Sequence, residues 1–242
     1  MVHPFEGEED ELLQVHRDLV SLNGVDEGLV YLQVSRGAPP DRDFLYPDPE
    51  TTRPTVVAFT QKLDNLVDNP LARNGISVVT VDDLRWKRRD IKTTQLLHAS
   101  MSKVLAKRAG CHDAWMVDEG GYVTEGTSNN AYIVKDGGTT IVTRPLSNDV
   151  LHGITRAAVL RLLRGSGSDD EEGTPPLRLE ERPFTVEEAK GEACEAFSTS
   201  ASSFVMPVVE IDGVPVGGGG KVGPVTERLR RIYVDECLKT AV

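Results

Sequence analysis

Lys92 stands between a strand-like run and a helix-like run, and this arrangement limits the possible fold more than any other feature. Residues 76–81 read Ile-Ser-Val-Val-Thr-Val, a pattern typical of a buried strand. A helix is expected from about residue 94 to residue 108, so Lys92 falls near a strand-to-helix turn. The positive end of the helix dipole, together with Arg88 and Arg89, favours the neutral amine, which can attack a carbonyl. The pattern predicts a reactive lysine in an α/β protein.

Three later segments carry polar groups of complementary kinds. Glu125 lies among small polar residues between two expected strands, residues 152–156 (His-Gly-Ile-Thr-Arg) open an expected helix, and residues 198–203 (Ser-Thr-Ser-Ala-Ser-Ser) form an expected hydroxyl-rich turn. A lysine, a carboxylate, a helix N-terminus and a polar turn are the parts of a pyridoxal phosphate site. The lysine forms the aldimine, the carboxylate keeps the pyridine nitrogen protonated, and helix N–H groups and hydroxyls receive the phosphate.

The remaining chain alternates helical and extended patterns, as an α/β (α+β) protein should. Periodicity predicts helices at 8–22, 152–164, 186–192 and 225–238, strands at 28–35, 54–59, 131–134, 140–143 and 205–211, a long loop at 36–47 and a solvated loop at 165–176.

Five motifs in a fixed order make a more specific pattern than any one of them. They are Asp-Leu-Arg-Trp-Lys-Arg-Arg-Asp-Ile-Lys at 83–92, Thr-Glu-Gly-Thr-Ser-Asn at 124–129, Arg-Pro-Leu-Ser-Asn at 144–148, Gly-Ile-Thr-Arg at 153–156 and Pro-Val-Val-Glu-Ile-Asp-Gly at 207–213. In these motifs the chain resembles the class IV (fold-type IV) aminotransferases that depend on pyridoxal phosphate, and within them the D-amino-acid aminotransferases. The resemblance runs from about Phe5 to the C-terminus.

The resemblance implies a fold and an activity. The expected fold has a small two-layer α/β domain at residues 1–60, incomplete at its N-terminus, an interdomain linker at 61–75, and a larger domain at 76–242 with a pseudo-barrel sheet and helices, which binds the cofactor. The expected activity moves the amino group of a D-amino acid such as D-alanine to a 2-oxo acid such as 2-oxoglutarate, through a Schiff base on Lys92. A homodimer is also implied.

Roles in the cofactor site follow from the same resemblance. Lys92 would carry pyridoxal phosphate and move the proton, and Glu125 would face the pyridine nitrogen. The backbone of Ile154 and the side chain of Thr155 would hold the phosphate.

Two groups of contacts follow the family pattern less closely. Close relatives often have a hydroxyl residue beside Ser200, where this chain has Ala201. The Ala201 N–H could still bind phosphate, with Ser200 or Ser202 supplying a hydroxyl. In the substrate pocket, Arg42 would hold the α-carboxylate, because a planar guanidinium suits a bidentate contact; Arg36 is the other candidate.

Composition excludes several classes of protein. The net charge of -11 argues against binding to nucleic acid, which usually needs a basic face. The three cysteines lack the spacing of a disulfide framework or a zinc site, and the five histidines show no metal-ligand spacing, so no metal is expected. The N-terminus lacks the features of a signal peptide, and no apolar run approaches membrane-spanning length. A cytoplasmic protein without membrane contact is expected.

Members of the family usually begin upstream of the first helix expected here. That upstream segment supplies early strands, an arginine that grips the cofactor phosphate and a tyrosine beside the aldimine, and nothing between residues 1 and 11 can replace it. The sequence is therefore expected to be either a shortened version of a longer chain or a degraded member. Three alternatives to the D-amino-acid activity stay open: an aminodeoxychorismate lyase, a branched-chain L-amino-acid aminotransferase, and a non-catalytic truncated remnant.

Overall fold

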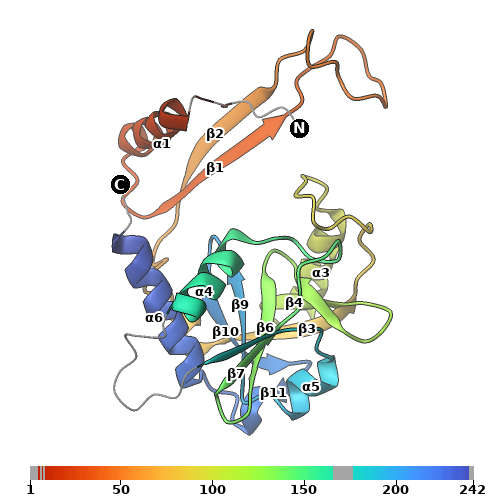
Figure 1. Cartoon of the computed structure of the whole chain (residues 1–242), viewed down its shortest axis with the longest axis vertical. Coiled ribbons are helices and arrows are strands. Elements are labelled where there is room, and N and C mark those ends of the chain that lie inside the picture. The colour runs from red at the N-terminus through yellow and green to blue at the C-terminus, as the bar shows by residue number, and fades with distance from the viewer. Residues whose placement is uncertain (1–4, 6, 8, 166–176, 240–242) are drawn as a thin grey trace. The chain divides into compact units, whose positions relative to one another are not determined.

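The computed structural model describes residues 5, 7, 9–165 and 177–239, and it forms two compact units, Met1–Leu66 and Val67–Val242 (Figure 1). The segment expected to be a linker, residues 61–75, has regular secondary structure at both ends. Its first two residues belong to a strand that ends at Lys62, and Pro70–Asn74 forms a short helix, α2, whose N-terminus is capped by the Asn69 side chain.

In its described residues, the first unit consists of one helix and a two-stranded sheet. Helix α1 (Glu9–Asn23) is followed by strands β1 (Gly28–Ser35) and β2 (Thr55–Lys62), which pair antiparallel along their whole length. Gly24 ends α1 in a left-handed conformation (φ 57°) and donates its N–H to the Ser21 carbonyl, as a C-terminal glycine does. The predicted helix and first strand are confirmed, and β2 runs further than predicted because its pairing with β1 continues to Gly28.

In the part of the chain that the structure describes, the second unit is built on a mixed sheet of nine strands. Eight of them follow the order β5-β4-β3-β10-β9-β6-β7-β8, and β11 pairs with β10. Neighbours β3 and β4, β3 and β10, and β7 and β8 run parallel, and the other pairs are antiparallel. The strands are β3 (Ile76–Asp82), β4 (Asp113–Val117), β5 (Val123–Gly126), β6 (Asn130–Lys135), β7 (Thr140–Thr143), β8 (Arg178–Glu181), β9 (Glu195–Ser200), β10 (Phe204–Ile211) and β11 (Val214–Pro215).

Helices cover both faces of this sheet. They are α2, α3 (Leu97–Arg108), α4 (Ile154–Gly165), α5 (Val186–Gly191) and α6 (Pro224–Lys239), with a short 3-10 turn at Val216–Gly218. Alternate residues of β6 enter different cores: Tyr132 packs with residues of α4 and α6, whereas Ile133 packs with residues of α2 and α5. Because side chains alternate across a strand, a sheet buried on both faces needs the nearly continuous apolar runs seen in the sequence.

The helix predicted from about residue 94 is confirmed but starts three residues later, and the predicted extent of the polar turn is wrong. Helix α3 begins at Leu97, not near residue 94, because Gln95 N–H bonds to the Thr93 hydroxyl at 3.3 Å and Leu96 N–H bonds to the Thr94 carbonyl at 2.9 Å. Such local bonds compete with the helix. Residues 198–200 are not a turn but the end of β9, which pairs with β10, so the turn is confined to residues 201–203.

The other predicted elements of this unit are confirmed within a few residues. The predicted loop at 165–176 lies outside the described residues, apart from Gly165 at the end of α4.

Candidate active site

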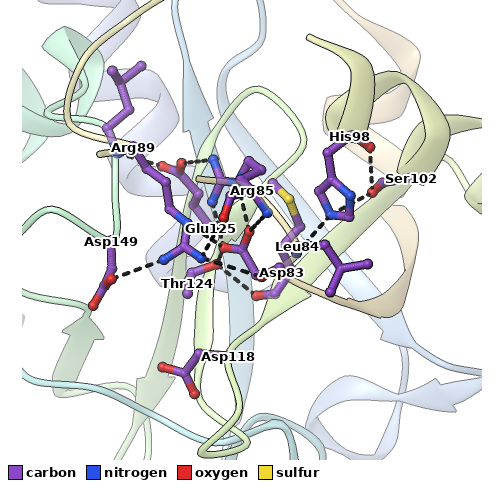
Figure 2. Close-up of polar contacts among 12 residues, drawn as sticks. Asp83, Leu84, Arg85, Arg89, His98, Ser102, Asp118, Thr124, Glu125 and Asp149 are labelled. Atoms are coloured by element: carbon purple, nitrogen blue, oxygen red, sulfur yellow. Dashed lines mark hydrogen bonds and ion pairs between the residues drawn. The ribbon is translucent and has the colours of Figure 1, made fainter. Parts of the chain in front are cut away.

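Glu125, in β5, is buried, with 4% of its surface exposed. Its Oε1 accepts a hydrogen bond from Arg85 Nη1 at 2.5 Å (Figure 2). Its Oε2 accepts from Asn130 Nδ2 at 3.1 Å and from Leu151 N–H at 3.0 Å. Burial raises the pKa of Glu125, and the opposing charge of Arg85 and the Leu151 N–H only partly offset that effect.

Asp83 holds the arginine that faces Glu125. Arg85 donates Nε to Oδ1 of Asp83 at 2.9 Å and Nη2 to Oδ2 at 2.8 Å, which leaves Nη1 for Glu125. Thr124 donates its hydroxyl to Asp83 at 2.7 Å, and Arg89 Nε lies 3.3 Å from the same carboxylate. Burial of Asp83 acts to raise its pKa, but the hydrogen bonds and charges of these partners outweigh it and leave the pKa lowered.

The start of α4 lies beside Glu125. The Leu151 carbonyl accepts from Asn130 Nδ2 at 2.9 Å, while the Leu151 N–H bonds to Glu125. Gly153 is packed so closely that a Cβ there would lie 2.2 Å from the Asn130 Oδ1, so any side chain at this position would displace Asn130. Ile154, the first residue of α4, is 83% exposed, whereas Thr155 is buried. The two predicted phosphate-binding residues therefore sit next to the buried carboxylate.

The predicted polar turn reaches the same end of the sheet. Asn130 lies opposite Thr199 in the pairing of β6 with β9, and Ser200 follows directly. The Ser200 hydroxyl accepts the Ser203 N–H at 3.1 Å, which closes the turn, and Ala201 and Ser202 are exposed. Through Asn130, the turn is close to both Glu125 and the start of α4.

Lys92 is exposed and lies in the irregular segment between β3 and α3. This segment is fastened at Arg89, whose N–H bonds to the Asn148 carbonyl at 2.9 Å and whose Nη1 bonds to Asp149 at 3.0 Å. Arg88 pairs with Asp90 at 2.9 Å. Both arginines therefore have carboxylate partners, so neither places an uncompensated positive charge beside the Lys92 amine. The positive end of the α3 dipole also lies further along the chain than predicted, because the helix begins later.

The two predicted substrate arginines belong to the first unit, between β1 and β2. The Arg36 guanidinium lies 4.0 Å from the centre of the Tyr46 ring, and that of Arg42 lies 5.1 Å from the centre of the Phe44 ring. Both arginines are exposed, and each stacks on an aromatic ring in a cation–π contact.

Sequence reasoning missed Asp83, Arg85 and Asn130 as parts of the site. All three stand inside or next to the quoted motifs, but their roles depend on partners distant in the chain. A signal was present in Asp83 and Arg85, because charged residues that directly follow a buried strand need partners when they are enclosed.

Within the described residues, no group of histidine, cysteine, aspartate and glutamate side chains could hold a metal ion. No helix in the same part of the chain is long and apolar enough to cross a membrane.

This fold and this set of motifs define a class IV aminotransferase. The sequence model of that family, described as amino-transferase class IV, matches residues 2–211, and the chain belongs to the family. Among solved structures, the T.th. branched-chain amino acid aminotransferase with pyridoxamine 5'-phosphate has a TM-score of 0.76 at 26% identity, covering 93% of this chain and 70% of that one. The Escherichia coli branched-chain enzyme has a TM-score of 0.73 at 24% identity over 93% and 70% of the two chains. The expected fold is confirmed.

Curated relatives are more similar in sequence. The D-alanine aminotransferase of Staphylococcus haemolyticus is 40% identical over 221 residues, which are 91% of this chain and 72% of that protein. The D-alanine aminotransferase of Bacillus licheniformis is 37% identical over 230 residues, or 95% and 75% of the two chains.

Proposed function

We propose that this chain is a pyridoxal-phosphate-dependent transaminase that moves the amino group of a D-amino acid, such as D-alanine, to a 2-oxo acid such as 2-oxoglutarate. The observation that carries the proposal is the buried Glu125 carboxylate, which accepts hydrogen bonds from Arg85 and from Leu151 in the segment before α4. D-alanine aminotransferases at 36–40% identity support the choice of donor. The similar solved structures favour a second candidate, a branched-chain L-amino-acid aminotransferase, at 22–26% identity.

The residues present fit this cofactor. A buried carboxylate suits a protonated ring nitrogen, and the first N–H groups of a twelve-residue helix suit a phosphate, since they have no intrahelical partner. We assign Glu125 to the ring nitrogen, and Ile154 and Thr155 to the phosphate. The turn adds hydroxyls from Ser200 and Ser202 and a backbone N–H from Ala201 as further phosphate ligands.

When bound, pyridoxal phosphate supplies an electron-withdrawing ring that stabilises negative charge on the substrate Cα. The chain's own part is to hold and move protons. Lys92 would hold the cofactor through Nζ and, as general acid and base, would move the proton between the substrate Cα and C4′ of the cofactor. Arg42, with Arg36 as the second candidate, binds the substrate α-carboxylate, for which an exposed guanidinium is suited.

The proposal includes assembly and location. A homodimer is supported by α3, where Leu97, Met101 and Leu105 are 72%, 56% and 48% exposed, since apolar side chains grouped on one helix are typical of an interface. A cytoplasmic location is supported by three free cysteines, which suit a reducing compartment. Sedimentation of the purified protein tests the dimer; a single species of monomer mass would contradict it.

The attachment site of the cofactor can be tested directly. Wild type, Lys92→Ala and Lys87→Ala are loaded with pyridoxal phosphate, reduced with borohydride and digested for mass spectrometry. Lys87 is the matched control, because it is an exposed lysine in the same motif. We expect a visible absorption band and a phosphopyridoxyl group at position 92 in wild type and Lys87→Ala, and neither in Lys92→Ala. Labelling at another lysine, or none in wild type, would contradict the assignment.

Stereochemistry separates the two candidate functions. Pyruvate formed from D-alanine and from L-alanine, and the branched-chain 2-oxo acid formed from L-leucine, are compared in the presence of 2-oxoglutarate. We expect turnover of D-alanine. Turnover of the L-amino acids alone would favour the branched-chain activity.

A further inference from the structure

Seven charged side chains form one continuous line of ion pairs through the second unit. Carboxylates and guanidinium groups alternate along it, in the order Glu125, Arg85, Asp83, Arg89, Asp149, Arg144 and Asp118, with successive contacts of 2.5, 2.8, 3.3, 3.0, 3.0 and 2.7 Å. Figure 2 shows its buried half, which joins the segment after β3 to β5. The line links three of the family motifs, so they are held together by charge as well as by the sheet.

Asp83 is the centre of the buried half. Its side chain is fully buried, and it occupies two of the three guanidinium nitrogens of Arg85, so Nη1 points to Glu125. Bidentate pairs of this kind fix the plane of the guanidinium as well as its distance. Without the Asp83 carboxylate, the described contacts of the Arg85 side chain are reduced to the Nη1 bond with Glu125, and a single bond does not fix the plane of the guanidinium.

Arg89 connects Asp83 to the Lys92 segment. Its side chain is 9% exposed and contacts Asp83 and Asp149, and its Nη2 lies 3.4 Å from the backbone carbonyls of Asp83 and Arg85. The neighbouring Arg88 differs: its side chain is 51% exposed, and it pairs with Asp90, two residues along the chain. Two adjacent arginines therefore have different structural roles.

We propose that Asp83, supported by Arg89, is a positioning residue that acts through Arg85 and Glu125 on the ring nitrogen of the bound cofactor. This inference rests on the proposed function. Asp83 keeps the Arg85 cation against Glu125, and the charged carboxylate then holds the ring nitrogen protonated. The effect of Asp83 on cofactor binding depends on the ring nitrogen, whereas a purely structural effect would not.

The dissociation constants of pyridoxal phosphate and of 1-deazapyridoxal phosphate, in which a C–H replaces the ring nitrogen, test this inference. We expect Asp83→Asn to weaken the binding of pyridoxal phosphate about 10- to 100-fold, the range for a charged hydrogen bond. The binding of the deaza analogue should weaken less than about threefold. Asp90→Asn is the matched control, since it removes the carboxylate of the more exposed pair with Arg88. It should leave both constants unchanged. Equal weakening of both cofactors, or no weakening by Asp83→Asn, would overturn the inference.

A second pair of variants keeps the test decisive if Asp83→Asn does not fold. Arg89→Gln should show the same selective loss of pyridoxal phosphate, and Arg88→Gln should bind both cofactors as wild type does. Thermal unfolding of each apo chain reports folding separately. If borohydride labels no Lys92 in wild type, the proposed function fails and this inference with it. If Lys92 is labelled but Arg89→Gln shows no selective loss, the inference alone fails.

Discussion

Helix α6 depends on one buried carboxylate from β9, and removing it should destabilise the second unit strongly. Glu195 is 5% exposed; its Oε1 accepts the Val225 N–H at 3.0 Å, and its Oε2 accepts the N–H and hydroxyl of Thr226 at 2.8 and 2.7 Å. These N–H groups belong to the first turn of α6, where no intrahelical partner exists. A negative charge there also interacts favourably with the helix dipole.

The cost of Glu195→Ala can be worked out from these contacts. Each buried donor left without a partner costs about 1 to 3 kcal/mol, and partial relaxation around three of them leaves a loss of about 3 to 5 kcal/mol. For a unit of this size the loss lowers Tm by about 10 °C. The two tryptophans, Trp86 and Trp115, lie in the second unit, so urea unfolding followed by tryptophan fluorescence reports on that unit.

Glu192→Ala is the control. Glu192 is 64% exposed and forms one ion pair with Lys135, so its loss should cost less than about 1 kcal/mol. If Glu195→Ala destabilises the unit by no more than Glu192→Ala, the carboxylate does not hold α6 and the reasoning is refuted. The consequence extends to the proposed phosphate site, because α4, which begins at that site, shares a hydrophobic core with α6.

Acid should weaken the ion pair between Glu188 and Arg182. Replacement of glycine by alanine should destabilise the protein more at Gly75 than at Gly110. The Arg182 hydrogen bond lowers the pKa of Glu188 from 4.5 to about 2, so the stability from this pair is present above pH 4.5 and is lost as pH falls toward 2. Urea unfolding should show Glu188→Gln about 1 to 2 kcal/mol less stable at pH 7, after allowance for solvent screening, with the difference shrinking toward pH 2; a constant difference would contradict this. Gly75→Ala should lower the free energy of unfolding by about 3 kcal/mol, because φ is 79° and a Cβ would lie 2.2 Å from Val209. Gly110→Ala, where φ is 76° but the space is open, should lower it by about 1 kcal/mol. Equal losses in thermal melts would refute the packing argument.

The sequence by itself determined the local elements and the family. Apolar periodicity and β-branched runs are local properties, so they predicted α1, β1, β3 and α6 within a few residues. Five ordered motifs were enough to indicate the class IV fold. Prediction from local sequence failed where a hydrogen bond between residues close in the chain decided the structure. The Thr93 hydroxyl accepts such a bond and helps to delay the start of α3.

Only the tertiary structure decided which charges meet. Arg85 and Glu125 are forty residues apart, and the sheet order β5-β4-β3 brings them to 2.5 Å. Arg89 and Arg88 are neighbours with the same side chain. Arg89 is 9% exposed and belongs to the line of ion pairs that contains Asp83, whereas Arg88 is 51% exposed. Sequence gives the types of residue available for such a line. Strand order and burial decide which of them share a low-dielectric interior, and there a charge is stable only with a partner.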